Sequence, residues 1–318
     1  MSEDARRWST ETDQVLRKAG WQPGRSVPTA TWEWILRERG EFEVHEAARR
    51  FLAEFGGLVT YGWPADSILT RSAIRFDPLK AEWDSATFAR LSEEAGTHLC
   101  PIGQADNGNS YLGIAADGAV YLAREHGELL AGTVDQALDR LVQLQGTQAG
   151  IWVPDVPVGA HSFWDRIEAV GPGADAERRW PAETDRVLRA AGWYPGRSVP
   201  TATWESILRQ QGEFEMHEAA QRFLAEFGCV GIPHREPRGS MPWGEFRLDP
   251  LLAMWDDEIL DDLSEQAGTY LYPVGMIDRT NQYVGVAEDG AVYVGMDSVR
   301  LLATTPDQAL QELTRRIR

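Results

Sequence analysis

The chain has few of the features that mark secreted or membrane proteins. It contains two cysteines in 318 residues, which excludes a framework of several disulfides. No apolar run approaches the ~20 residues that a membrane span requires. The stretch MSEDARRWSTETD is acidic where a secretion signal would be basic, and no apolar segment follows it. We therefore expect a cytoplasmic protein in which Cys100 and Cys229 are free thiols.

Positive charge is also scarce. Lys and Arg number 31 against 49 Asp and Glu, which gives a formal net charge of −18. Nucleic acids are bound through a positively charged surface that neutralises phosphates, so a direct nucleic-acid ligand is not expected. The negative charge leaves two interpretations open: a basic partner, or solubility alone.

Repetition is what the chain has in abundance. AGWQPGRSVPTATWE begins at Ala19, and AGWYPGRSVPTATWE begins at Ala191. The same offset pairs residues along both halves without a gap, including Phe55 with Phe227, Asp77 with Asp249, Trp83 with Trp255, Tyr111 with Tyr283 and Gly118 with Gly290. Two equal units of ordinary domain size are indicated, each able to bury its own core.

The boundaries follow from where the pairing stops. We expect a first domain over residues 1–145, a linker over 146–177 and a second domain over 178–318. The linker contains Trp152, Phe163 and Trp164, which flexible Gly/Ser linkers lack, so it is predicted to pack on one or both units.

Local patterns within one unit predict an α+β fold. Ser9 and Gly20 bracket a helical pattern, Pro23 and Gly24 indicate a turn, and Thr29 is placed to cap a second helix. HEAARRFLAEFGG predicts a third helix. Four short runs then favour strands (SAIRFDP, HLCPIG, YLGIAADGAVYLA and ELLAG), and two further helices are predicted at WDSATFARLSEEAG and TVDQALDRLVQL. Such segregation indicates helices packed around a mostly antiparallel or mixed sheet, and the duplicated motif forms its helix-turn-helix junction.

These motifs together resemble a known family. AGW.PGR, HEAA.RFLAEFGG, DP before a short helix, G.A.DGAVY and the final DQAL helix are similar, in order and spacing, to the SUKH superfamily of immunity proteins, third subgroup, here as a tandem duplication. The resemblance implies one α+β domain per unit. It also implies a bacterial protein that binds and neutralises a polymorphic toxin, a class that includes nucleases and nucleic-acid deaminases. The fusion of two units leaves the stoichiometry of a complex open.

No complete catalytic or metal-binding motif is present. His45 and Glu46 begin like a zinc-protease motif, but Arg49 stands where the second histidine belongs, so His45 and His217 are expected to cap helices or contact an interface. We predict no catalytic residue, no cofactor and no metal. Arg25 and its copy Arg197 leave two interpretations open: a clamp for an anion, or a structural contact with a carboxylate or carbonyl group.

The partner is expected to meet residues that differ between the units. Trp63 faces Arg235 in the alignment of the two copies, and Trp243 faces Arg71. The second unit also has an acidic helix that the first lacks. The predicted partner-binding residues are therefore Trp63, Trp243, Asp256, Asp257, Glu258, Asp261 and Asp262. Drift on a solvated surface is the alternative reading of these differences.

The functional expectation is a non-enzymatic immunity protein that occludes a basic protein toxin. An adaptor or scaffold with an endogenous partner is the alternative. A small-molecule hydrolase or nucleotide-binding protein is a third possibility, and it rests on no complete motif.

Overall fold

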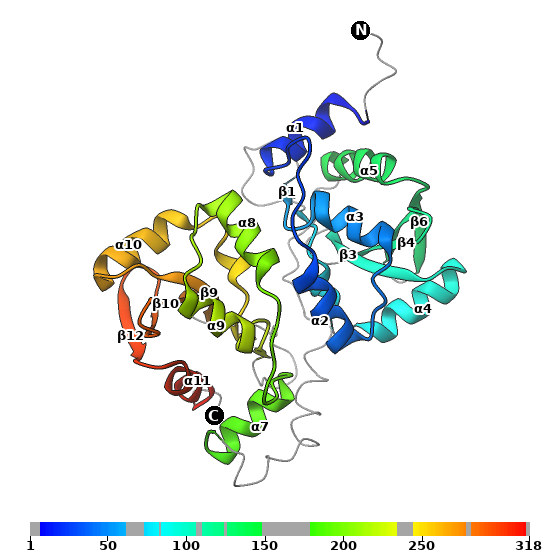
Figure 1. Ribbon diagram of the computed structural model, residues 1–318. Helices are drawn as coiled ribbons and strands as arrows, with labels where there is room; N and C mark the ends of the chain where they lie inside the picture. The colour runs from blue at the N-terminus through cyan, green and yellow to red at the C-terminus, as the bar shows by residue number, and fades with distance from the viewer. Residues whose placement is uncertain are drawn as a thin grey trace. The chain divides into compact units, whose positions relative to one another are not determined.

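The computed structural model describes residues 7–61, 73–82, 84–105, 110–123, 126–147, 179–233, 244–277 and 281–315. The chain divides into two compact units, residues 1–155 and 156–318 (Figure 1). Trp63 and Trp243 lie outside the described residues, as does the predicted linker after its first two residues, which end a helix.

The first unit is an antiparallel sheet with helices packed against it. Its described helices are α1 (Thr10–Lys18), α2 (Ala30–Gly40), α3 (Glu46–Phe55), η2 (Pro78–Ala81, a 3-10 helix), α4 (Ser85–Ala95) and α5 (Val134–Thr147). Its strands are β1 (Val59–Tyr61), β2 (Ala73–Arg75), β3 (Leu99–Ala105), β4 (Ser110–Ala115), β5 (Val120–Ala123) and β6 (Gly127–Ala131). The strands are neighbours in chain order, and each pair is antiparallel.

The second unit repeats this arrangement. Its described helices are α7 (Ala182–Ala190), α8 (Ala202–Gly212), α9 (Glu218–Phe227), η5 (Pro250–Ala253, a 3-10 helix), α10 (Asp257–Ala267) and α11 (Pro306–Arg315). Its strands are β7 (Gly231–Pro233), β8 (Gly244–Arg247), β9 (Tyr272–Ile277), β10 (Gln282–Val286), β11 (Val292–Gly295) and β12 (Val299–Ala303), again paired antiparallel in chain order. The α+β class and the tandem duplication are confirmed.

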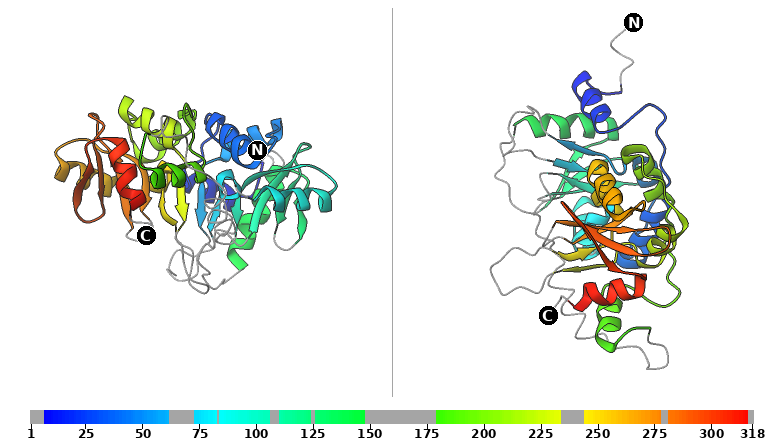
Figure 2. Two further views of the ribbon diagram at one scale, coloured as in Figure 1. Left: turned by 90° about the horizontal axis from the view of Figure 1, so that it is seen from below. Right: turned by 90° about the vertical axis from the view of Figure 1, so that its left-hand side faces the viewer.

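Each unit has its own apolar core. In the first, α3 contacts β3 and β4, and α4 contacts β3 and β6. All seven residues of β3 are buried, as expected for a central strand covered by helices. Trp32 and Phe55 are among the largest fully buried side chains, and so are their copies Trp204 and Phe227. The two views in Figure 2 show both sheets with their helices.

The duplicated motif forms a tight junction between helices. The Arg25 N–H donates to the Gln22 carbonyl (3.0 Å), and Gly24 has φ of 80°, the value that a type II turn requires after proline. Thr29 precedes α2 as predicted. Its hydroxyl, however, donates to Glu33 Oε1 (2.6 Å) and does not cap a backbone N–H, so the capping role expected for this side chain is wrong.

His45 caps α3, which confirms the structural interpretation of this residue. Its Nδ1 accepts from the Ala48 N–H (3.2 Å), and Nε2–H donates to the Ile114 carbonyl (3.1 Å). His217 repeats both contacts with Ala220 and Val286. Because Nδ1 serves as an acceptor, this geometry requires the neutral imidazole.

The stability of the first unit should fall in mildly acidic solution. Burial lowers the pKa of His45 below its ordinary value of 6.5, although the bond to Ile114 opposes this shift. The imidazole therefore binds a proton more readily in the unfolded chain than in the folded one. The stability that neutral His45 contributes is complete above pH 6.5 and is lost as the pH falls toward the pKa of His45 in the folded protein. Urea unfolding between pH 8 and pH 5 should show this loss. His45→Asn, which keeps an N-cap acceptor that does not titrate, should flatten the dependence, and His217→Asn should leave it in place. An equal pH dependence in the His45→Asn protein would contradict the assignment.

Candidate protein-binding surface

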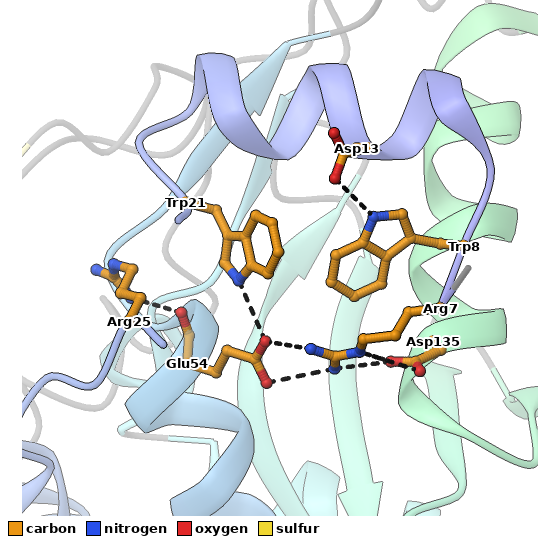
Figure 3. A network of polar contacts seen from close by, with 7 residues as sticks. All are labelled: Arg7, Trp8, Asp13, Trp21, Arg25, Glu54 and Asp135. Carbon is orange, nitrogen blue, oxygen red and sulfur yellow. Dashed lines mark hydrogen bonds and ion pairs between the residues drawn. The ribbon is translucent and has the colours of Figure 1, made fainter. Parts of the chain in front are cut away.

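A polar network joins α1, α3 and α5 in the first unit (Figure 3). Arg7 bridges Glu54 (2.5 Å) and Asp135 (2.9 Å). Trp21 donates its indole N–H to the same Glu54 carboxylate (3.2 Å). Arg25 donates to the backbone carbonyls of Glu54 (2.7 Å) and Gly56 (2.8 Å), which satisfies acceptors at the C-terminal end of α3.

The second unit contains the same network. Arg179 bridges Glu226 (2.6 Å) and Asp307 (2.5 Å), Trp193 donates to Glu226 (3.2 Å), and Arg197 donates to the Glu226 carbonyl (2.7 Å). The sequence left two interpretations open for the guanidinium groups of Arg25 and Arg197. In the structure, both groups bind carbonyl oxygens. This network is part of the framework that both units share, and it does not distinguish one unit from the other.

The side chains considered for catalysis or metal binding are buried or hydrogen-bonded within the fold. Burial raises the pKa of the Cys100 thiol to about 12, so it stays protonated near neutral pH, and both cysteines are free and buried. No cluster of three or more His, Cys, Asp or Glu side chains in the described ranges is placed to hold a metal ion. His45 uses both ring nitrogens within the fold.

Four of the predicted partner-binding carboxylates lie together on α10. Asp257, Glu258, Asp261 and Asp262 are all exposed, and Glu265 continues the same face one turn later. Within the described part of the chain, none of them has an ion-pair or hydrogen-bond partner. The helix therefore presents negative charge that no described residue neutralises.

Asp256 belongs to the framework and not to this exposed group. It precedes α10 and accepts a hydrogen bond from the Tyr283 hydroxyl (2.5 Å). Tyr111 and Asp84 form the same contact in the first unit. Because both units keep this pair, Asp256 has a structural role that its position in an acidic run concealed.

The first unit lacks this charged helix. Ser85, Ala86, Ala89 and Arg90 stand where α10 has its four exposed carboxylates. Arg90 pairs with Glu94 of the same helix (2.5 Å), so α4 is partly neutralised by its own side chains. The contrast between the two units is thus one of surface charge on equivalent helices.

Sequence reasoning missed an aromatic residue at the start of α10. Trp255 lies between η5 and α10, and its side chain is 45% exposed. The comparison of the two copies did not single it out, because it repeats Trp83, which lies outside the described residues. A large aromatic directly before an acidic helix N-terminus was the available signal.

Tyr270 lies just beyond the end of α10. Its hydroxyl accepts from the Glu215 N–H (3.0 Å). Burial raises the pKa of Tyr270, and the charges of Glu215 and Asp261 add to the shift, which places Asp261 close enough to act on it. We name Trp255, Asp257, Glu258, Asp261 and Asp262 the α10 surface.

Comparison with known proteins gives one family. The family model described as SUKH-3 immunity protein matches residues 8–144 and again residues 180–316. No curated protein and no solved structure matches the chain. The described helices include none with the length and apolar character needed to cross a membrane.

Proposed function

Because the chain belongs to the SUKH-3 immunity protein family, we propose that it neutralises a protein toxin by binding it. The family match over both units carries this proposal. Occlusion is the mechanism: the immunity protein covers the surface that the toxin needs, and no bond is made or broken. The Cys100 thiol stays protonated near neutral pH because burial raises its pKa, so it is not an activated nucleophile.

The α10 surface supports a basic partner. Its carboxylates attract positive charge over a distance and accelerate association, while an exposed indole such as Trp255 can be buried in an apolar pocket and slow dissociation. A toxin that acts on nucleic acid needs a positive surface for phosphate groups. Covering such a surface with carboxylates would both recognise the toxin and block its substrate.

Charge reversal on α10 should slow binding. We expect the Asp261→Lys/Asp262→Lys protein to associate with its cognate toxin about tenfold more slowly at low salt, with the difference shrinking as salt rises. Stopped-flow or surface-based kinetics at several salt concentrations measures this. The Glu11→Lys/Glu38→Lys protein has the same change in net charge on exposed sites of the first unit and should keep its rate.

Two results would count against the proposal in different ways. Equal slowing in both variants would mean that net charge acts without a specific surface, and unchanged rates would remove the α10 surface from the interface. A toxin that is neither bound nor inhibited by the unaltered chain would overturn the immunity function itself.

A further inference from the structure

The second sheet ends at β12, and no described strand pairs with the outer edge of β12. The Val299 N–H donates to Gln266 Oε1 on α10 (3.1 Å) and is therefore directed away from β11. Ladder bonds alternate along an antiparallel pair, so Leu301, two residues further on, also directs its N–H and C=O outward. Its side chain is 47% exposed. An extended peptide can add to such an edge as another strand.

The side chain of Leu301 lies on the face of the sheet that carries α10. Gly295 is opposite Val299 in the register, and a Cβ atom on Gly295 would lie 2.7 Å from Leu263 Cδ2 of α10. Opposed residues share a face, and so do residues two apart in one strand. The side chain of Arg300 consequently lies on the opposite face of the sheet. In the right-hand view of Figure 2, the strands of this sheet run between α10 in gold and α11 in red.

A row of carboxylates on α10 ends at this edge. Gln266 joins α10 to β12, Asp262 lies one turn before it on the same row of the helix, and Glu258 lies one turn earlier. Residues at this spacing have Cβ atoms about 6 Å apart. A strand added to β12 would meet this anionic row at its Gln266 end, so lysine and arginine side chains on the α10 face would be attracted to Asp262 and, one turn further, to Glu258.

The equivalent edge of the first unit is closed and neutralised. Leu129 of β6 is 58% exposed, so no described element covers this edge, and what closes it is hydrogen bonding to its backbone. Arg140 donates to the carbonyl of the next residue, Leu130. Arg90 stands at the position of Asp262 and pairs with Glu94. Glu94 also accepts a hydrogen bond from the backbone N–H of Gly127, the first residue of β6 (3.0 Å).

The second unit has lost the guanidinium that closes this edge. Glu312 stands where the first unit has Arg140, and it pairs with Arg315 (2.9 Å). A carboxylate cannot donate to the carbonyl of Leu302, which corresponds to Leu130. The edge of β12 therefore differs from that of β6 in two ways. No arginine corresponding to Arg140 donates to its carbonyl, and the helix beside it carries different charges.

We propose that β12 binds an extended, basic segment of the partner protein as an added strand, with its Lys or Arg side chains along Glu258 and Asp262. This mode of docking rests on the proposed function, because it extends the α10 surface. The charge along α10 and the open backbone of β12 select the same occupant: a strand in which basic residues alternate with apolar ones. The edge of β6, with its paired charges, would not bind it.

A synthetic peptide of about eight residues that alternates Lys and Val tests the proposal on the full chain. We expect binding at low salt, together with slower hydrogen exchange at the Leu301 amide and unchanged exchange at Leu129. N-methylation of the peptide amides that face β12 should weaken binding about tenfold, because the ladder bonds are lost while the charge remains. Leu301→Pro, which removes the outward N–H, should weaken binding by a similar factor, and the matched Leu129→Pro should not.

Equal affinity for the methylated and unmethylated peptides would overturn strand addition, as would no binding at low salt or an equal effect of the two proline variants. If Leu301→Pro fails to fold, the peptide comparison on the unaltered chain still decides. The toxin assay separates this proposal from the immunity function. A Leu301→Pro chain that neutralises the toxin with full affinity would reject the edge and leave immunity intact.

Discussion

Glu82→Met is expected to destabilise the first unit by about 3–5 kcal/mol. Glu82 and Arg39 form an ion pair (3.1 Å) in which the two side chains are 8% and 5% exposed. Removing the carboxylate leaves the Arg39 guanidinium buried without its partner charge, and the cost of that exceeds the contribution of the pair itself. Urea unfolding of the full chain should show the transition of the first unit moving to lower concentration.

The second unit supplies the rescue for this substitution. At the matching positions it has Gln211 and Met254 in place of Arg39 and Glu82. Arg39→Gln/Glu82→Met should therefore recover most of the loss, because no buried charge remains. The recovery should be incomplete, since the Gln211 amide has no hydrogen-bond partner among the described residues. A double variant as unstable as Glu82→Met would contradict this account.

Trp255→Ala should weaken toxin binding by about 2 kcal/mol or more, roughly thirtyfold in Kd. The indole is exposed in the free protein and precedes carboxylates that have no partner among the described residues, an arrangement in which an aromatic anchor gains most from burial in a partner. The loss should lie in the dissociation rate. Binding kinetics at fixed salt measures it, with unfolding followed in parallel.

Tyr194 provides the control for Trp255. It is also an exposed aromatic of the second unit, 40% accessible, and it lies in the duplicated motif away from α10 in sequence. Tyr194→Ala should bind as the unaltered chain does. Should the Trp255→Ala protein keep its affinity, Trp255 would have no anchoring role, and Trp243, predicted from the sequence alone, would remain to be tested.

The fold was largely predictable because its signals are local. The apolar spacing of α3, its His45 cap and its terminal Gly56 all lie within twelve consecutive residues. The turn between β4 and β5 is equally local: it contains the adjacent pair Asp117-Gly118, and Gly118 has φ of 93°. Strand β1 was missed, because three residues are too few to show a period of two.

The candidate site was harder to predict because its parts depend on contacts distant in sequence. The bond from Tyr283 to Asp256 crosses 27 positions, so a run of aspartates could not reveal which one the fold uses. Trp255 repeats Trp83, so the comparison of the two copies did not single it out, whereas its exposure depends on how η5 meets α10. The four outer carboxylates were identified correctly as an exposed charged face, because helical spacing alone determines it.

Because the two sheets have the same strand order, a strand can pair with the wrong sheet while the chain is synthesised and folds. Every strand of one sheet has a counterpart that could insert in the other, and exchange between similar neighbouring domains is a common kinetic trap. The central strands oppose it. Tyr272 of β9 occupies the position that Cys100 holds in β3, and both are fully buried. A misplaced β9 would force a phenol ring into the volume of a thiol, so divergence of the two cores directs each strand to its own domain.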